Sequence, residues 1–202
     1  LISKMGSAKK RVVYSFPEDV TWKLKLLAYL LYKYGGRLSE HCYSFRRRVT
    51  AGTAFRKIRR ISDLDGKYVL KADIHNYFNS IPPLRLIEVL ENVIDDDPEL
   101  LEFMRKVLLD DRCLYNGEII CEQKGAMAGV PLASFFANFY LLSLDQVFES
   151  LGADYFRYSD DILVFADSEE QIRKYYDILL EHITAKGLAL NPDKIVFYSP
   201  GD

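Results

Sequence analysis

The sequence predicts an α+β fold built around an antiparallel sheet. Strand and helix patterns follow one another in mixed order along the 202 residues, and the clearest strand pair is a hairpin made by Tyr155–Tyr158 and Ile162–Phe165. Hydrophobic residues make up 49% and charged residues 28% of the chain, which is typical of a globular protein with a substantial core. This composition excludes a disordered chain, a collagen-like chain and a disulfide scaffold.

Runs of β-branched and aromatic residues between turn formers predict the strands. In chain order they are Lys10–Phe16, Lys67–Ala72, a hairpin within Leu114–Ile119, Tyr155–Tyr158, Ile162–Phe165, and one or two strands within Leu188–Tyr198. Asn116-Gly117 is a strong signal for the turn of the first hairpin. Asp160 and Asp161 lie between the arms of the second hairpin, so we expect two acids at its tip.

Prolines, capping residues and glycines mark the ends of the predicted helices. In chain order the helices are Pro17–Tyr34, a basic helix that carries Phe55–Arg60, a helix from Pro82-Pro83 to about Ile94, Glu99–Leu109, Pro131–Ser150 and Ser168–Lys186. Thr50 and Ser168 suit the N-cap position. Gly35-Gly36 and Gly187 suit helix ends.

The formal net charge of −2 conceals a strong asymmetry. Residues 1–60 carry 15 Lys and Arg against 3 Asp and Glu, a net of +12, whereas residues 61–202 carry a net of −14. Such a division indicates that the basic part meets a polyanion.

The three cysteines, Cys42, Cys113 and Cys121, form no metal-binding pair and are typical of reduced thiols in a cytoplasmic protein. The most apolar run, Leu24–Tyr34, is too short and too charged to span a membrane. The chain begins at Leu1 rather than Met, which we interpret as an excised piece of a longer protein.

Three acids stand at chemically suggestive places. Asp73 follows an apolar strand, and Asp160 and Asp161 lie between two further strands. If the hairpin pairs beside the Asp73 strand, the three carboxylates converge. Clustered oxygen ligands without His or Cys suit Mg²⁺, and two such ions about 4 Å apart support phosphoryl transfer. The alternative is an ordinary solvated turn, in which Asp is common.

Five ordered segments resemble the reverse transcriptase family, of the prokaryotic type found in group II introns, retrons, diversity-generating elements and phage defence. They are SFRRR (Ser44–Arg48), KADIHNYFNSIP (Lys71–Pro82), AGVPLASFFANFYL (Ala128–Leu141), YSDD (Tyr158–Asp161) and GLALNPDKIVFYS (Gly187–Ser199). The resemblance covers nearly the whole chain. It implies an RNA-directed DNA polymerase, whose primer 3′-hydroxyl attacks the α-phosphate of a deoxynucleotide.

The resemblance also assigns the acids. Asp73, Asp160 and Asp161 would be the catalytic carboxylates, and together with the Ile74 carbonyl they would hold two Mg²⁺ ions. The implied partners are an RNA template, a DNA or RNA primer and deoxynucleoside triphosphates, with a cognate structured RNA as a further candidate and no membrane. The implied location is the bacterial cytoplasm.

The nucleotide pocket is assigned by the same resemblance. Phe78 takes the place of the family's steric gate, which would exclude a ribose 2′-hydroxyl; the alternative is a plain core Phe. Lys4 and Arg11 would grip the triphosphate, although Lys9 and Lys10 could substitute and a solvated terminus is the alternative. The remaining nucleotide-binding candidates are Ala128, Gly129 and Lys194, of which Lys194 could equally just end a strand.

Ala128 departs from the family pattern, because many relatives have Gln there. We therefore expect a looser nucleotide pocket and lower or altered fidelity.

The segment Ser44–Arg60 is rich in basic residues and has no acid. Its aromatic residues, Phe45 and Phe55, add possible stacking platforms, so we expect the segment to follow a template backbone. The candidate nucleic-acid contacts are Arg46, Arg47, Arg48, Arg56, Lys57, Arg59 and Arg60. A helix with one solvated basic face is the alternative.

The resemblance implies the fingers and palm of a right-hand polymerase, with an antiparallel palm sheet backed by helices and with the thumb beyond Asp202. Residues 1–66 and 84–117 would form the fingers, and residues 67–83 and 118–202 the palm. Because the thumb is missing, we expect this fragment to be weakly active or inactive alone. An RNA-dependent RNA polymerase and a non-catalytic RNA-binding module of palm fold are the alternatives.

Overall fold

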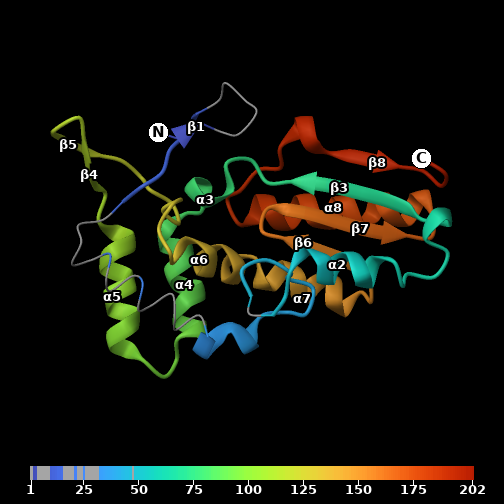
Figure 1. The fold of residues 1–202 in the computed structure, drawn as a ribbon, viewed down its shortest axis with the longest axis horizontal. Coiled ribbons are helices and arrows are strands. Elements are labelled where there is room, and N and C mark those ends of the chain that lie inside the picture. Colours follow the sequence, from blue (N-terminus) through green and yellow to red (C-terminus); the bar gives the residue numbers. More distant parts are fainter. Residues whose placement is uncertain (1, 4–9, 16–20, 22–24, 26–31, 47) are drawn as a thin grey trace.

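The computed structural model describes residues 2–3, 10–15, 21, 25, 32–46 and 48–202. Its centre is an antiparallel sheet with the strand order β6-β7-β3-β8 (Figure 1). The strands are β3 (Tyr68–Asp73), β6 (Asp154–Tyr158), β7 (Asp161–Ala166) and β8 (Val196–Tyr198). The predicted α+β fold with an antiparallel sheet is therefore confirmed.

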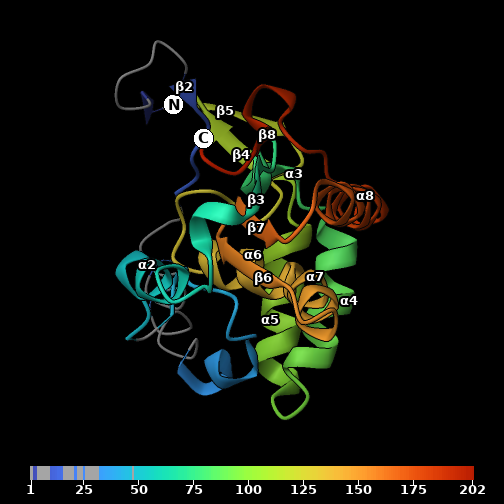
Figure 2. The ribbon, with the colours of Figure 1, turned by 90° about the vertical axis from the view of Figure 1, so that its right-hand side faces the viewer.

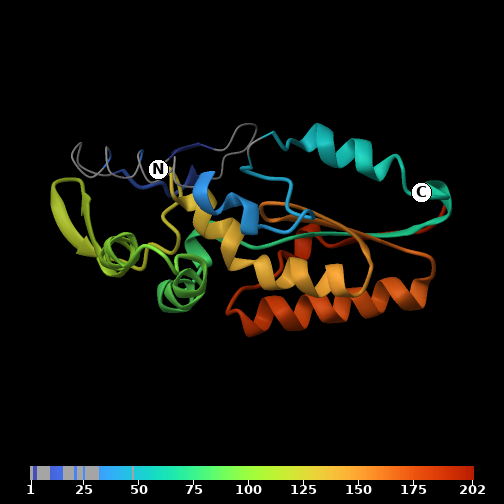
Figure 3. The same ribbon diagram turned by 90° about the horizontal axis from the view of Figure 1, so that it is seen from below.

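Both faces of the sheet are covered, because side chains of a strand point alternately to opposite faces. Ile162 and Val164 of β7 join the main core, against which α8 (Glu169–Ala185) packs. Leu163 and Phe165 join a smaller cluster that includes Ile58 at the end of α2 (Ala51–Ile58). Accordingly, α2 lies on one side of the sheet and α8 on the other (Figures 2 and 3).

The predicted helix Pro131–Ser150 is wrong as a single element. The structure contains α6 (Ala133–Tyr140) and α7 (Leu142–Ser150), with Leu141 between them at φ −99° and ψ 7°. Neither glycine nor proline marks the break. Instead, the Tyr140 hydroxyl donates a hydrogen bond of 2.5 Å to the carbonyl of Lys186, just past the end of α8, so tertiary packing fixes the chain at this point.

The predicted helices in the middle of the chain and the small hairpin follow the predictions closely: they are α4 (Pro83–Val93), α5 (Pro98–Leu109), β4 (Arg112–Tyr115) and β5 (Glu118–Cys121). One short helix, α3 (Tyr77–Ser80), was not predicted. Asn116 and Gly117 both have positive φ, at 51° and 88°, as the predicted two-residue turn requires. Short 3₁₀ turns cover Gly35–Arg37, Leu64–Gly66 and Pro192–Lys194. α4 packs on α6 and so joins this outer part to the main core.

The N-terminal strand is shorter than predicted. β2 covers only Lys10–Arg11 and pairs with β1 (Ile2–Ser3). Residues 12–15 leave that pairing because the Tyr14 amide donates instead to the Ala128 carbonyl, at 2.8 Å. The predicted helix Pro17–Tyr34 lies mostly outside the described residues, and its last residues, 32–34, are helical. In the described part of the chain, no helix has the length and apolar character needed to cross a membrane.

Candidate active site

The pairing of β3 with β7 places Asp73 directly opposite Asp161. Asp160 is adjacent, and its carbonyl accepts a hydrogen bond of 3.2 Å from the Ile74 amide. Residues 87 positions apart in the sequence (160 − 73) therefore meet at one edge of the sheet. The expected position of Asp161 at the hairpin tip is wrong, because Tyr158 pairs with Asp161 and only Ser159 and Asp160 form the turn.

Asp73 is nearly buried, with 4% of its surface exposed, and each oxygen of its carboxylate accepts a hydrogen bond. Lys194 donates from Nζ to Oδ2 at 2.6 Å, and Asn191 donates from Nδ2 to Oδ1 at 3.4 Å. The backbone amide of Asn191 also donates to the Asp73 carbonyl, at 2.7 Å. Lys194 and Asn191 therefore both contact Asp73, and the sequence motif that contains them did not suggest a role for Asn191.

The electrostatics of the site reflect its crowded acids. The pKa of Asp161 is raised, first by desolvation and then by the charges of Asp160 and Asp73. The pKa of Lys194 is raised mainly by its hydrogen bond to Asp73. The oxygen-only donor set suits Mg²⁺ chemically. Within the described residues, however, no three His, Cys, Asp or Glu side chains are arranged to hold a metal ion, and Asp73 pairs with Lys194.

Phe78 lies in α3 and is partly buried against the main core. Its ring centre is 6.4 Å from that of Phe45, which is in turn 6.5 Å from the ring of Tyr158. Tyr158 ends the strand that leads into the aspartate turn. Phe78 is thus part of an aromatic group beside the acids, and both the gate and the core interpretation remain compatible with this position.

Ala128 and Gly129 lie against the N-terminal segment, with Ala128 buried and Gly129 exposed. Ala128 is 8% exposed and its carbonyl accepts the amide of Tyr14. Gly129 has φ +100°, and a Cβ there would lie 3.0 Å from the Cβ of Val13. Of the two predicted triphosphate contacts, Lys4 lies outside the described residues, and Arg11 is described only through its backbone pairing with Ile2.

The predicted template contacts fall into two groups. In the first, Arg46 is held by the protein itself, because its Nη1 donates to the carbonyls of Ser39 and Cys42, at 2.6 and 3.2 Å. Arg48 is exposed and has φ +62°. Arg47 lies outside the described residues.

The second group lies on and just after α2, where Arg56, Lys57, Arg59 and Arg60 are all exposed. Lys57 is paired with Glu40 at 3.7 Å and lies over the Tyr43 ring, so an acid from outside the basic segment partly neutralises it. Arg56 donates to Thr53 Oγ1 at 3.2 Å. Arg59 and Arg60 therefore present their charge to solvent beside a helix that covers one face of the sheet.

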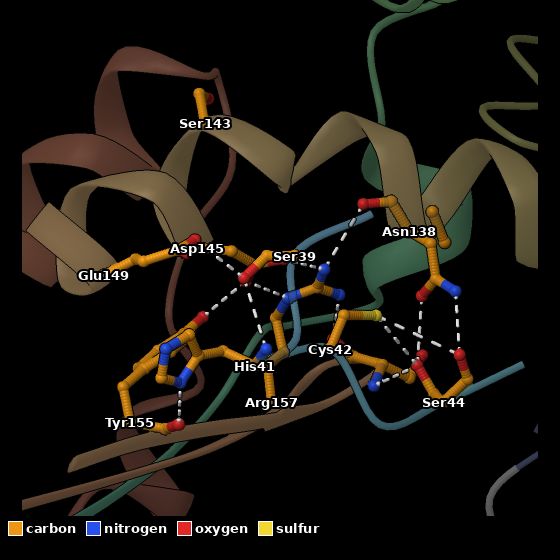
Figure 4. Close-up of polar contacts among 12 residues, drawn as sticks. Ser39, His41, Cys42, Ser44, Asn138, Ser143, Asp145, Glu149, Tyr155 and Arg157 are labelled. Atoms are coloured by element: carbon orange, nitrogen blue, oxygen red, sulfur yellow. Dashed lines mark hydrogen bonds and ion pairs between the residues drawn. The ribbon is translucent and has the colours of Figure 1, made fainter. Parts of the chain in front are cut away.

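A buried polar network beneath the aspartate turn was missed by the sequence reasoning (Figure 4). Arg157 and Asp145 form a fully buried ion pair at 2.6 Å, and Ser44 and Asn138 are hydrogen-bonded to each other nearby. The available signal was the placement of two charged residues at inward-facing positions. Asp145 follows Leu144 on an apolar helix, and Arg157 lies two positions after Tyr155 on β6 and so on the same face of the strand.

Residues 2–201 match the model of the family described as "Reverse transcriptase (RNA-dependent DNA polymerase)". The chain belongs to the reverse transcriptase family. Among relatives of this reverse transcriptase domain is the "Retron Ec83 reverse transcriptase" of Escherichia coli, which is 28% identical over 144 residues. That match covers 65% of this chain and 44% of the relative, so the chain spans less than half the length of the curated relative that it matches.

Solved telomerases share the fold of this reverse transcriptase domain. Apo telomerase from Candida tropicalis superposes with a TM-score of 0.64 at 17% identity, over 90% of this chain and 36% of that chain. Telomerase from Candida albicans, in complex with a fragment of telomeric RNA, gives a TM-score of 0.65 at 16% identity, over 89% of this chain and 35% of that chain. At these identities the similarity concerns the fold alone.

Proposed function

We propose that this chain is the fingers-and-palm part of an RNA-directed DNA polymerase, which adds deoxynucleotides to a primer 3′-hydroxyl. The observation that carries the proposal is the pairing of Asp73 with Asp161 across β3 and β7, with Asp160 in the adjoining turn. Membership of the family supports it, as does the Escherichia coli retron relative. In this assignment residues 67–83 and 118–202, which include the sheet, α6, α7 and α8, are the palm, and residues 1–66 and 84–117 are the fingers.

Asp73, Asp160, Asp161 and the Ile74 carbonyl are the proposed ligands of two Mg²⁺ ions. When bound, these ions stabilise the attacking and leaving oxygens of the phosphoryl transfer. The chain's own contribution is to position the reactants and to supply fixed charge. In this assignment Asp73 would hold a metal ion in place of the Lys194 ammonium, and that ammonium would then be free to meet the triphosphate. Lys194 is therefore both a neutralising partner of Asp73 and a proposed nucleotide contact.

The remaining proposed contacts surround these acids. Phe78 excludes the ribose 2′-hydroxyl, and Ala128 and Gly129 border the incoming nucleotide. Lys4 and Arg11 grip the triphosphate. Arg46, Arg47, Arg48, Arg56, Lys57, Arg59 and Arg60 line the template path, with Arg59 and Arg60 the most directly available of the residues that the structure describes.

RNA is the proposed template, in keeping with the family and with a telomerase structure determined in complex with telomeric RNA. A bacterial cytoplasmic location is also proposed, supported by three free cysteines and by the origin of the retron relative.

The test is primer extension on an RNA template by the full-length protein that contains this chain. Wild type and Asp160→Ala are compared with Mg²⁺ and with either deoxynucleotides or ribonucleotides. Asp154→Ala is the matched control, because Asp154 is exposed at the far end of β6. We expect deoxynucleotide addition by wild type and by Asp154→Ala, and none by Asp160→Ala. Extension that survives Asp160→Ala contradicts the mechanism, and selective use of ribonucleotides favours an RNA polymerase.

A further inference from the structure

Ser159, the first residue of the aspartate turn, has an unusual backbone conformation. Its φ is +61°, in the left-handed region that non-glycine residues rarely occupy, and it is 5% exposed. Its side-chain hydroxyl has no hydrogen-bond partner among the described residues. Something other than the Ser159 side chain must therefore keep the turn in this conformation.

Two buried side chains are hydrogen-bonded to the backbone of Ser159, one at its N–H and one at its C=O. The Ser159 amide donates to Oγ of Ser44 at 2.9 Å, and the Ser159 carbonyl accepts from Nη1 of Arg157 at 3.3 Å. Ser44 and Arg157 are both completely buried. The residue immediately before Asp160 is thus fixed at its N–H and at its C=O by separate parts of the chain.

Ser44 is itself fixed by Asn138 of α6. The Ser44 hydroxyl donates to Oδ1 of Asn138 at 3.0 Å, and Nδ2 of Asn138 donates back to the Ser44 carbonyl at 2.8 Å (Figure 4). Because the hydroxyl donates its one proton to Asn138, its lone pairs are oriented to accept the Ser159 amide. The reciprocal pair makes Ser44 a directional acceptor.

Arg157 is fixed by Asp145 of α7. Nε and Nη2 of Arg157 donate to the two oxygens of Asp145 at 2.7 and 2.6 Å, and the Tyr155 hydroxyl donates to Oδ1 at 2.9 Å. Nη2 also donates to the Asn138 carbonyl, at 3.3 Å. A buried ion pair is often no more stabilising than apolar residues of equal volume, so stability alone is a weak reason for it. The pair has a more specific role, because it holds Arg157 where Nη1 can donate to the Ser159 carbonyl.

We propose that Ser44 and Arg157 are positioning residues that hold Ser159 so that Asp160 and Asp161 meet Asp73. This inference rests on the proposed function of the three aspartates. It also connects two regions, because Ser44 directly precedes Phe45 and Arg46 in the segment expected to contact the template. The position of that segment and the position of the reacting acids are tied through the Ser44 hydroxyl, and the backbone of His41 and Tyr43 adds two hydrogen bonds to Arg157.

The test uses Ser44→Ala and Arg157→Lys in the full-length protein. Alanine removes the acceptor for the Ser159 amide with little change in volume. Lysine keeps the charge opposite Asp145 but loses the fork that reaches Ser159 and Asn138. Ser143→Ala is the matched control, because the Ser143 hydroxyl bonds His182 at 3.1 Å and is not part of the contacts to Ser159.

Three experiments are carried out on each variant: primer extension, which gives kcat and KM; thermal unfolding; and binding of Mn²⁺ alone, followed by electron paramagnetic resonance. For Ser44→Ala we expect kcat and Mn²⁺ affinity to fall about 10- to 100-fold, because residues that orient metal ligands have effects of that size. KM for the deoxynucleotide should change little, and the protein should remain folded at the assay temperature. Arg157→Lys should show the same pattern if it folds.

Normal kcat and normal Mn²⁺ affinity in folded Ser44→Ala overturn the inference, as does an equal loss in Ser143→Ala. A loss of kcat accounted for by the unfolded fraction also overturns it. Failure of the proposed function looks different, because wild-type protein would then show no extension of the primer. Mn²⁺ binding by Ser44→Ala still tests the positioning role in that case.

Discussion

Lys194 and Asp73 form an ion pair of 2.6 Å although 121 positions separate them in the sequence. The pair joins the end of the central strand β3 to the 3₁₀ turn Pro192–Lys194. Asp73 is nearly buried, whereas about half of the Lys194 side chain is exposed. Lys194 can therefore leave Asp73 with little change in the hydration of its ammonium group. The nearly buried Asp73 carboxylate would then need another cation in its place.

Replacing Lys194 tests this exchange. In Lys194→Met, the nearly buried Asp73 loses its ammonium partner, so we expect a loss of about 1 to 3 kcal/mol of stability without Mg²⁺. Mg²⁺ should stabilise this variant more than wild type, because no ion pair has to be broken first. Calorimetric Mg²⁺ titration and thermal unfolding measure both effects. Lys174→Met, at an exposed position of α8, is the control, and equal Mg²⁺ affinities in Lys194→Met and wild type would contradict the exchange.

Gly125 lies directly against the backbone of the Phe78 segment. It has φ +58°, and a Cβ there would lie 2.5 Å from the Phe78 carbonyl oxygen. Gly125→Ala should therefore cost about 3 kcal/mol, combining left-handed strain with overpacking. Gly152→Ala is the control, since Gly152 has φ +62° with no atom within 4 Å of the added Cβ, and it should cost only about 1 kcal/mol. Urea unfolding measures the difference, and equal costs would show that the clash is relieved.

His182 makes stability depend on pH. Burial and then the charge of Lys186 lower its pKa in the folded chain, while Asp145 acts in the opposite direction. The unfolded chain therefore binds more protons, so this contribution to stability is present above about pH 6.5 and is lost as the pH falls below that value. His182→Gln keeps a hydrogen-bonding group near Ser143 and should lose less stability than wild type between pH 7.5 and pH 5.5. Parallel losses in urea unfolding would refute this.

Arg59 and Arg60 test the proposed template path. Each charge that neutralises a phosphate adds about 0.7 to 0.9 to the slope of log affinity against log salt. Arg59→Ala and Arg60→Ala should each lower the slope by that amount, with little change in stability. Arg46→Ala should instead destabilise the fold, because Arg46 holds the carbonyls of Ser39 and Cys42. RNA binding measured over a range of salt concentrations decides, and an unchanged slope in both the Arg59 and the Arg60 variant would favour a merely solvated basic face.

Phe78 tests the choice of sugar. Phe78→Val removes part of the ring and should raise the ribonucleotide to deoxynucleotide ratio of kcat/KM about 10- to 100-fold. Phe55→Val, at a ring that is 64% exposed on α2, is the control and should leave the ratio unchanged. If Phe78→Val lowers stability without changing the ratio, Phe78 is a core residue and not a gate.

Local signals predicted most of the secondary structure. Asn116-Gly117 and Ser168 act within a few residues of their own positions, so the turn and the helix start that they specify were found. The break at Leu141 was not predictable in this way. α6 is buried on nearly all sides, so its apolar pattern has no period that could reveal an interruption, and the break depends on the contact of Tyr140 with Lys186.

The same difference between local signals and long-range contacts decides which parts of the candidate site could be predicted. The convergence of Asp73 with Asp160 and Asp161 was an inference from strand ends, and the register of β3 and β7 is compatible with it. The partners Asn191 and Lys194 reach Asp73 only through the turn that follows Leu190, which no short-range pattern describes. Asp145 and Arg157 were missed because each looks unfavourable alone, and only their pairing makes burial acceptable.

The strand order has a consequence for the order of synthesis. β3 has no strand partner until β7 is made, 88 positions later for the Asp73–Asp161 pair (161 − 73). At roughly 5 to 20 residues per second, β3 waits on the order of ten seconds on the ribosome with both edges unpaired. Lys71 lies within β3, after the apolar residues Val69 and Leu70, and a charge at such a position opposes association with strands of other chains. In the finished sheet the Lys71 charge has no such role, because β3 is then paired on both edges.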